Sequence, residues 1–182
     1  YRDTSIDLNF EKDTLTVYNP NIILKNPYEV KFPDNNKGNF IGSLDKNNNV
    51  IYVSSKRKDY YFEYKTKTLG KFFISTDTIG PIIEKINKKD RTNNKTIRLR
   101  IRDEETGIKK YTATINNEWA LFEYEPKKSL IQFKSDDFIQ LQEENELFIV
   151  VEDLLGNKTI YNETIYYKPW FSFTKLSKNP IA

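Results

Sequence analysis

Apolar and polar residues alternate along most of the chain, in short runs that end at Asn, Asp, Gly or Pro. In residues 5–10, for example, Ile6, Leu8 and Phe10 alternate with polar residues, which is typical of a half-buried β-strand. Helical periodicity is nearly absent, and only residues 136–143 have the composition of a single helical turn. The pattern therefore predicts an all-β protein.

Two sets of strands are expected. A first β-sandwich module over residues 1–76 has predicted strands at residues 5–10, 14–18, 28–32, 39–44, 50–54, 60–64 and 70–76. Turns are expected at residues 12–13 and 45–49, because Asp and Asn tolerate positive φ angles.

A second module over residues 77–168 has predicted strands at residues 82–86, 96–103, 108–115, 118–125, 129–133, 145–152 and 158–166. About seven short strands separated by turn signals are typical of an immunoglobulin- or fibronectin-like sandwich. Residues 169–182 form a C-terminal tail, whose aromatic residues we expect to pack back on this module.

The two modules meet in residues 69–81, which read L-G-K-F-F-I-S-T-D-T-I-G-P. Residues 71–75 predict the closing strand of the first module, and Gly80-Pro81 precedes the opening strand of the second. Residues 77–79 are too few for a flexible linker. The sequence therefore predicts a short, stiff joint.

Composition limits the functional classes. The chain of 182 residues can hold two β modules, and its 14% aromatic content favours cores of Phe, Tyr and Ile. The net charge of +3 comes from basic and acidic residues scattered along the chain, which argues against nucleic-acid binding. No apolar run approaches the roughly 20 residues of a membrane span.

Three residue types are missing. Without His or Cys the chain lacks the commonest general base, thiolate nucleophiles and the usual zinc ligands, so we expect no enzyme and no cofactor in these residues. Without Met the chain has no initiator residue, and we expect it to be a piece of a longer polypeptide.

Four segments carry a resemblance to a known family. They are D-T-I-G-P at residues 77–81, D-E-E-T-G-I-K-K-Y at 103–111, I-N-N-E-W-A-L-F-E-Y-E-P-K at 115–127 and N-E-L-F-I-V-V-E-D-L-L-G-N at 145–157. In this order they resemble the C-terminal immunoglobulin-like β-sandwich region of Gram-negative lysostaphin-type zinc peptidases, which cut peptidoglycan cross-links. The zinc ligands of that family's catalytic domain include His, so the catalytic domain is absent from these residues.

The resemblance implies a protein of the periplasm or cell surface. Its expected role is non-catalytic: an accessory or positioning region of an exported cell-envelope, peptidase-like protein. The expected partners are peptidoglycan or another glycan, an envelope protein, or the protein's own catalytic domain. The alternative is a structural or interaction subunit of a bacterial surface or secretion assembly, similar to an adhesin stalk, in which short D-T-x-G-P joints also occur.

Trp119 has two interpretations. It could be an exposed platform on which a sugar ring stacks. Because it stands beside Leu121 and Phe122 in a predicted alternating strand, we expect it instead to be a core residue.

Carboxylates gather at predicted strand ends of the second module. Asp77, Asp103, Glu105 and Asp153 are the candidate ligands of a calcium ion, which prefers oxygen ligands from loops. No EF-hand spacing is present, and Asp is also an ordinary turn residue that accepts hydrogen bonds from nearby backbone N–H groups. We therefore expect turn chemistry rather than a metal.

Basic residues alternate on one predicted strand. Arg98, Arg100 and Arg102 are expected to face outward, and Lys110 is expected on a neighbouring strand. This stripe is a candidate surface for an anionic glycan or a protein partner. The competing interpretation, which we prefer because Glu104 and Glu105 are near, is a solvated face that discourages aggregation at a sheet edge.

Overall fold

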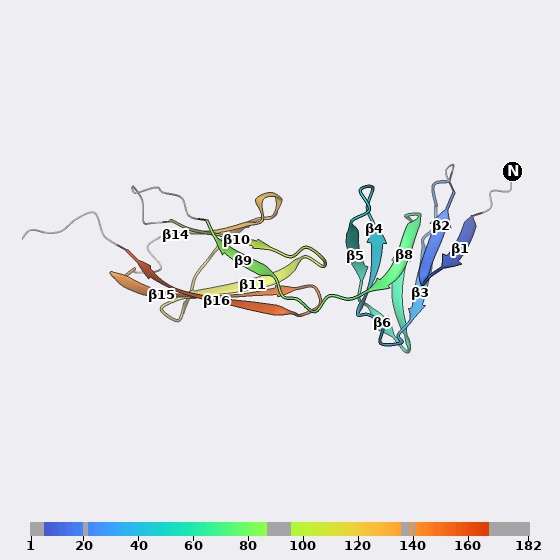
Figure 1. Ribbon diagram of the computed structural model, residues 1–182. Coiled ribbons are helices and arrows are strands. Elements are labelled where there is room, and N and C mark those ends of the chain that lie inside the picture. Colours follow the sequence, from blue (N-terminus) through green and yellow to red (C-terminus); the bar gives the residue numbers. More distant parts are fainter. Residues whose placement is uncertain (1–5, 20–21, 87–95, 136–138, 140, 168–182) are drawn as a thin grey trace, which may run out of the picture. The chain divides into compact units, whose positions relative to one another are not determined.

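The computed structural model describes residues 6–19, 22–86, 96–135, 139 and 141–167, and this part of the chain is almost entirely β (Figure 1). The all-β sandwich prediction is confirmed. The strands are β1 (Asp7–Glu11), β2 (Thr14–Tyr18), β3 (Tyr28–Pro33), β4 (Phe40–Leu44), β5 (Val50–Ser54), β6 (Arg57–Lys58), β7 (Tyr61–Thr66), β8 (Gly70–Ser75), β9 (Ile82–Lys85), β10 (Thr96–Arg102), β11 (Ile108–Ile115), β12 (Glu118–Trp119), β13 (Glu123–Glu125), β14 (Leu130–Lys134), β15 (Glu144–Asp153) and β16 (Lys158–Tyr166), with one 3₁₀ turn at Pro126–Lys128.

The chain divides into two compact units. The first takes in the described residues of Tyr1–Ile82, Arg102–Lys110 and Val151–Thr159, and the second takes in those of Ile83–Ile101, Tyr111–Val150 and Ile160–Ala182. No sheet in the described residues combines strands from both sides of residues 76–81. The predicted boundaries at residues 76 and 168 stay predictions, and residues 168–182, the expected tail, lie outside the described residues.

The first unit contains a five-stranded sheet, ordered β1-β2-β8-β4-β5, and a three-stranded sheet, ordered β3-β7-β6. Buried residues of both sheets pack together as one core, so the two sheets face each other. The core consists of Val17, Val30, Phe32, Ile41, Phe62 and Phe72.

Strand β1 departs from the expected half-buried pattern. Leu8 and Phe10 pair with Val17 and Leu15 of β2, which places them on the core face of the sheet. Nevertheless Leu8 is 71% and Phe10 64% exposed. The expectation of half burial was wrong because the facing sheet has only three strands, so the core face of the edge strand β1 stays uncovered.

The remaining strands form two four-stranded sheets, ordered β13-β14-β10-β9 and β12-β11-β15-β16. The predicted inward residues Leu99, Ile101, Leu147, Ile149 and Val151 are buried. Residues 102–110, which join β10 to β11, and residues 151–159, which join β15 to β16, belong to the first compact unit together with the strand ends that they include.

The single strand predicted at residues 118–125 was wrong. Its two ends belong to different sheets, because β12 pairs with β11 whereas β13 pairs with β14. Between them Ala120 and Phe122 are buried. The chain therefore crosses the core in this segment. The alternating residues that predicted one strand belong to two short strands in different sheets.

The predicted turns are confirmed by their backbone angles. Lys12-Asp13 has positive φ at both residues, as a two-residue hairpin turn requires, and Asn116-Asn117 between β11 and β12 has the same feature. Asn48 in the loop after β4 also has a positive φ, of 63°. Of the predicted helical turn at residues 136–143, residues 136–138 and 140 lie outside the described residues.

Candidate functional site

Three aspartates lie close together within the first compact unit. Asp77 follows β8, Asp103 begins the loop after β10, and Asp153 ends β15. One carboxylate oxygen from each lies within 4.8 Å of the others. Asp77 and Asp153 are buried and Asp103 is half-buried. The fold thus brings together three of the four predicted calcium candidates, whereas Glu105 is exposed and lies outside this cluster.

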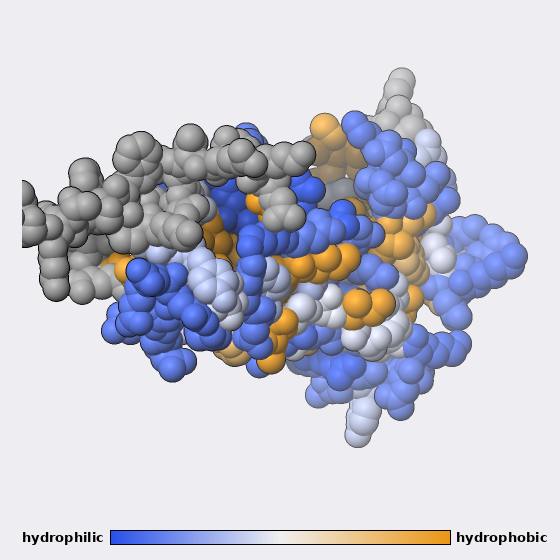
Figure 2. All heavy atoms as spheres, turned by 60° about the vertical axis from the view of Figure 1, so that its left-hand side comes forward, coloured by the Kyte–Doolittle hydropathy of each residue, from blue (hydrophilic) through white to orange (hydrophobic). Residues whose placement is uncertain are grey.

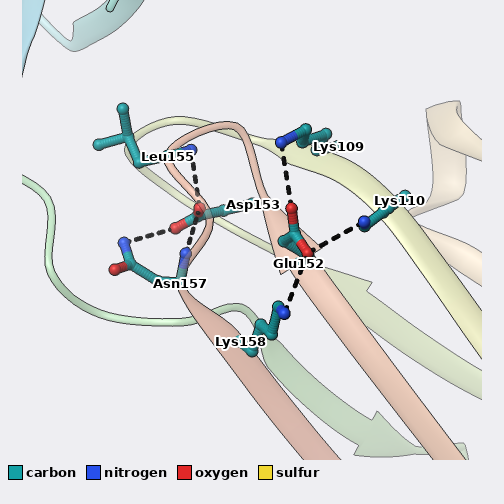
Figure 3. Close-up of polar contacts among 7 residues, drawn as sticks. All are labelled: Lys109, Lys110, Glu152, Asp153, Leu155, Asn157 and Lys158. Atoms are coloured by element: carbon teal, nitrogen blue, oxygen red, sulfur yellow. Dashed lines mark hydrogen bonds and ion pairs between the residues drawn. The ribbon is translucent and has the colours of Figure 1, made fainter.

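Both carboxylate oxygens of Asp153 accept hydrogen bonds from the loop that follows it (Figure 3). Oδ1 accepts from the backbone N–H groups of Leu155 and Asn157, both at 2.8 Å, and Oδ2 accepts from Nδ2 of Asn157 at 2.7 Å. Gly156 supplies the positive φ, of 95°, that the turn needs. Asp153 therefore organises the β15–β16 hairpin loop.

The exposed loop between β4 and β5 repeats the same hydrogen-bond pattern. Asp45 Oδ1 accepts from the N–H groups of Asn47 and Asn49, at 2.8 and 2.9 Å, and Oδ2 accepts from Nδ2 of Asn49 at 3.1 Å. Asn48 takes the positive-φ position that Gly156 takes in the other loop. Since Asp45 is not a member of the aspartate cluster, the pattern is a property of the turn.

Asp103 and Asp77 are bound through Thr106. Asp103 Oδ1 accepts from the backbone N–H groups of Thr106 and Gly107, at 2.7 and 2.8 Å. The Thr106 hydroxyl donates to Asp77 Oδ2 at 2.8 Å, and Asp77 Oδ1 accepts from the N–H of Ile79 at 3.0 Å. Every aspartate of the cluster therefore accepts local hydrogen bonds, as the turn interpretation expects.

The segment at Asp77 is also bound through its backbone. Asn39 donates from Nδ2 to the Asp77 carbonyl at 2.6 Å and accepts from the Asp77 N–H at 3.0 Å. Asn157 donates to the same carbonyl at 3.3 Å.

A calcium ion at this cluster would have Asp77, Asp103 and Asp153 as ligands. Calcium takes six to eight oxygens, so three carboxylates would need further donors. The expectation of turn chemistry rather than a metal stays a prediction, and the hydrogen bonds account for the position of each carboxylate.

Glu152, beside Asp153, is surrounded by three lysines (Figure 3). Its carboxylate contacts Nζ of Lys109 at 3.1 Å, Lys110 at 3.3 Å and Lys158 at 3.6 Å. The hydrogen bond from Lys109 lowers the pKa of Glu152 below its ordinary value, and Lys110 adds to this, although desolvation opposes both. Around Glu152 alone the three ammonium groups outnumber the carboxylate, but the neighbouring carboxylates of Asp77, Asp103 and Asp153 offset this excess of formal positive charge at the same end of the sheet.

The structure separates the predicted basic residues. The expectation that Lys110 neighbours the arginine strand was wrong, because β11 belongs to the sheet opposite β10. On β10, Arg98 Nε donates to Gln132 Oε1 at 2.6 Å, Arg100 is exposed, and Arg102 Nη1 lies 3.9 Å from Glu104 Oε1. Across β14, the register puts Glu123 in the row of Arg98 and Glu125 in the row of Arg100. Acidic residues thus accompany the arginines, as on a solvated face.

Trp119 is exposed, so the expectation that it is a core residue was wrong. It pairs with Thr114 on β11, and 67% of its surface is accessible. Phe122 takes the core position instead, because the chain changes sheets between β12 and β13. The signal that was available in the sequence is the Asn116-Asn117 turn, which fixes Trp119 opposite Thr114.

Within the described residues, no helix has the length and hydrophobicity needed to cross a lipid bilayer. In comparisons with known proteins, no family model matches the chain, and the curated proteins include no match to it.

Proposed function

We propose that the chain is a non-catalytic accessory region of an exported, peptidase-like protein of the cell envelope. It positions that protein by binding a wall polymer, an envelope protein or its own catalytic domain. The proposal rests on the resemblance of residues 69–166 to the C-terminal region of lysostaphin-type peptidases, together with a surface suited to contact.

The observation that carries the binding role is the exposure of large apolar side chains on sheet faces. Leu8, Phe10, Trp119 and Ile160 are each more than half exposed. Figure 2 shows hydrophobic residues interspersed among hydrophilic ones on the face turned to the viewer. Leu8 and Phe10 are neighbours on one face of β1, and grouped exposed apolar side chains are a feature of interaction sites.

The test is a pull-down of the purified 182-residue chain with purified sacculi. We expect the chain to sediment with the sacculi and to stay in the supernatant when the sacculi are omitted. A chain that stays in the supernatant in both cases contradicts wall binding. The remaining envelope-protein role would then be tested by cross-linking in intact cells.

A second candidate function is an interaction subunit of a surface or secretion assembly. It is favoured by strand β1, an edge strand whose core face is uncovered at Leu8 and Phe10, because such a strand can be extended by a neighbouring module. Sequencing the parent gene upstream of Tyr1 separates the two candidates. A His-x-x-x-Asp and His-x-His set there supports the peptidase parent, whereas further sandwich repeats support the stalk.

A further inference from the structure

The outer face of the sheet β12-β11-β15-β16 carries a group of exposed and half-buried side chains within the second compact unit. Along β15, Leu147 and Ile149 are buried, so Phe148 and Val150 point to the outer face. Along β11, Ala113 and Ile115 are buried, so Thr112 and Thr114 do the same.

Contacts between the strands fix how these side chains are arranged. The N–H of Asn116 on β11 donates to the carbonyl of Glu146 on β15 at 2.9 Å. Lys110, six residues before Asn116, contacts Glu152, six residues after Glu146. These pairs set an antiparallel register that places Thr114 opposite Phe148. Since Trp119 pairs with Thr114 on its other side, Trp119, Thr114 and Phe148 form one row across three strands.

Strand β16 completes the face. The Thr164 hydroxyl donates to Glu146 Oε1 at 3.2 Å, which places the even-numbered residues of β16 on the outer side with Glu146. Ile160 and Asn162 are accordingly exposed. We call this group the tryptophan face, and it consists of Thr112, Thr114, Trp119, Phe148, Val150, Ile160 and Asn162.

The seven residues of the tryptophan face carry no formal charge, and the charged residues of the same side of the sheet lie at its two ends, with Glu146 at one end and Lys110, Glu152 and Lys158 at the other. Between these ends the face combines an indole and a phenyl ring with two hydroxyls and one carboxamide. This central part offers no charge to an ionic ligand, whereas a polyol can both stack on the rings and exchange hydrogen bonds. The C–H faces of a pyranose ring pack on aromatic rings, and its hydroxyls exchange hydrogen bonds with Thr and Asn side chains.

We infer that the tryptophan face binds an uncharged saccharide chain. Trp119 and Phe148 lie two strand spacings apart, about 10 Å, which is the length of a disaccharide unit. Each ring can therefore stack on one of two alternate sugars, while Thr114 between them bonds to hydroxyls. The inference rests on the proposed wall-binding function and assigns it a ligand class and a surface.

The test is an NMR titration of the ¹⁵N-labelled 182-residue chain with the uncharged N-acetylglucosamine tetramer. The indole Nε1–H resonance of Trp119, assigned by its loss in Trp119→Phe, should shift in a saturable manner. Trp119→Ala should weaken binding by about tenfold or more, because the stacking contact is removed. Trp119 is exposed, so the variant should fold, which its amide spectrum would show.

Tyr60→Ala is the matched control, because Tyr60 is an exposed aromatic residue of the first unit and the tryptophan face belongs to the second. It should bind as the wild type does. Retention of the wild type on sacculi without any tetramer binding would overturn the inference and leave the proposed function standing. Equal affinity of Trp119→Ala and the wild type would also overturn it, as would dimerisation of the wild type that Trp119→Ala abolishes. Failure of the wild type in both assays would remove the wall-binding function as well.

Discussion

At the residue scale, aspartates in two hairpin loops make the same hydrogen bonds in different surroundings. Asp45 and Asp153 each accept two backbone N–H groups and a carboxamide from the Asn four residues later. Asp45 lies on an exposed loop, whereas Asp153 is fully buried. This pair allows the effect of burial to be measured with the turn geometry held constant.

We expect Asp153→Ala to cost about 3 kcal/mol in free energy of unfolding, and Asp45→Ala about 1 kcal/mol. The larger cost is expected because the Asp153 carboxylate is fully buried and its removal leaves a space beside two half-buried amides, whereas water replaces the Asp45 carboxylate on its exposed loop. Urea unfolding followed by fluorescence gives both values. Equal costs would mean that the loop at Asp153 is more open to water than its burial indicates.

Glu152 predicts a dependence of stability on pH. Its folded-state pKa is lowered, chiefly by the hydrogen bond from Lys109, so its contribution is fully present above the ordinary value of 4.5 and is lost as the pH falls through the folded value. Thermal unfolding of the wild type and Glu152→Gln should therefore differ most near neutral pH and converge in acid.

The control for this experiment is Glu104→Gln. Glu104 is exposed, and its carboxylate lies 3.9 Å from Nη1 of Arg102. At neutral pH, the Glu104→Gln variant should change the midpoint temperature of unfolding less than Glu152→Gln does. If the melting temperatures of the wild type and Glu152→Gln still differ in acid, the effect of the substitution comes from packing rather than from charge.

At the scale of the element, β1 is a strand with no cover on its core face. Replacing Leu8 and Phe10 together by Thr should change the free energy of unfolding by no more than about 0.5 kcal/mol. Phe72→Ala, in the shared core of the two sheets, should cost about 3 to 5 kcal/mol. Chemical denaturation measures both, and a large cost for the β1 variant would show that its apolar face is covered in solution.

Most elements could be predicted from alternation and turn residues. Four strands have the predicted bounds: Thr14–Tyr18, Val50–Ser54, Ile108–Ile115 and Lys158–Tyr166. In each, apolar and polar residues alternate between strong turn signals, which is the pattern of a strand with one buried face. The change of sheet after Trp119 could not be predicted. Alternation indicates which residues of a strand face a core, but it does not indicate to which of the two sheets the strand belongs.

The candidate site was predictable only in part. Asp77, Asp103 and Asp153 could be placed at strand ends, and antiparallel hairpins gather such ends at one edge. The exposure of Trp119 was also within reach of the sequence, because the Asn116-Asn117 turn sets Trp119 opposite Thr114, on the side of β11 away from the buried Ala113 and Ile115. The sheet of Lys110 could not be assigned, because the pairing of β11 beyond this hairpin is a long-range choice.

At the scale of the whole molecule, the net charge of +3 offers a competing explanation for any wall binding. Attraction of basic residues to an anionic polymer weakens as salt shortens the Debye length, whereas stacking on an uncharged face does not. Retention on sacculi should therefore persist between about 0.05 and 0.5 M NaCl. Elution by salt would assign the binding to the lysines around Glu152 or to the arginines of β10.

Substitutions in the turns of the molecule can also raise its thermal stability. Eight non-glycine residues of the described chain have positive φ, and two of these, Lys12 and Ser129, are neither Asn nor Asp. A side chain with a Cβ pays about 1 kcal/mol for this conformation, which Gly does not. Lys12→Gly and Ser129→Gly should each raise the melting temperature in calorimetry. A variant with both substitutions would be a more thermostable background for mutating the tryptophan face.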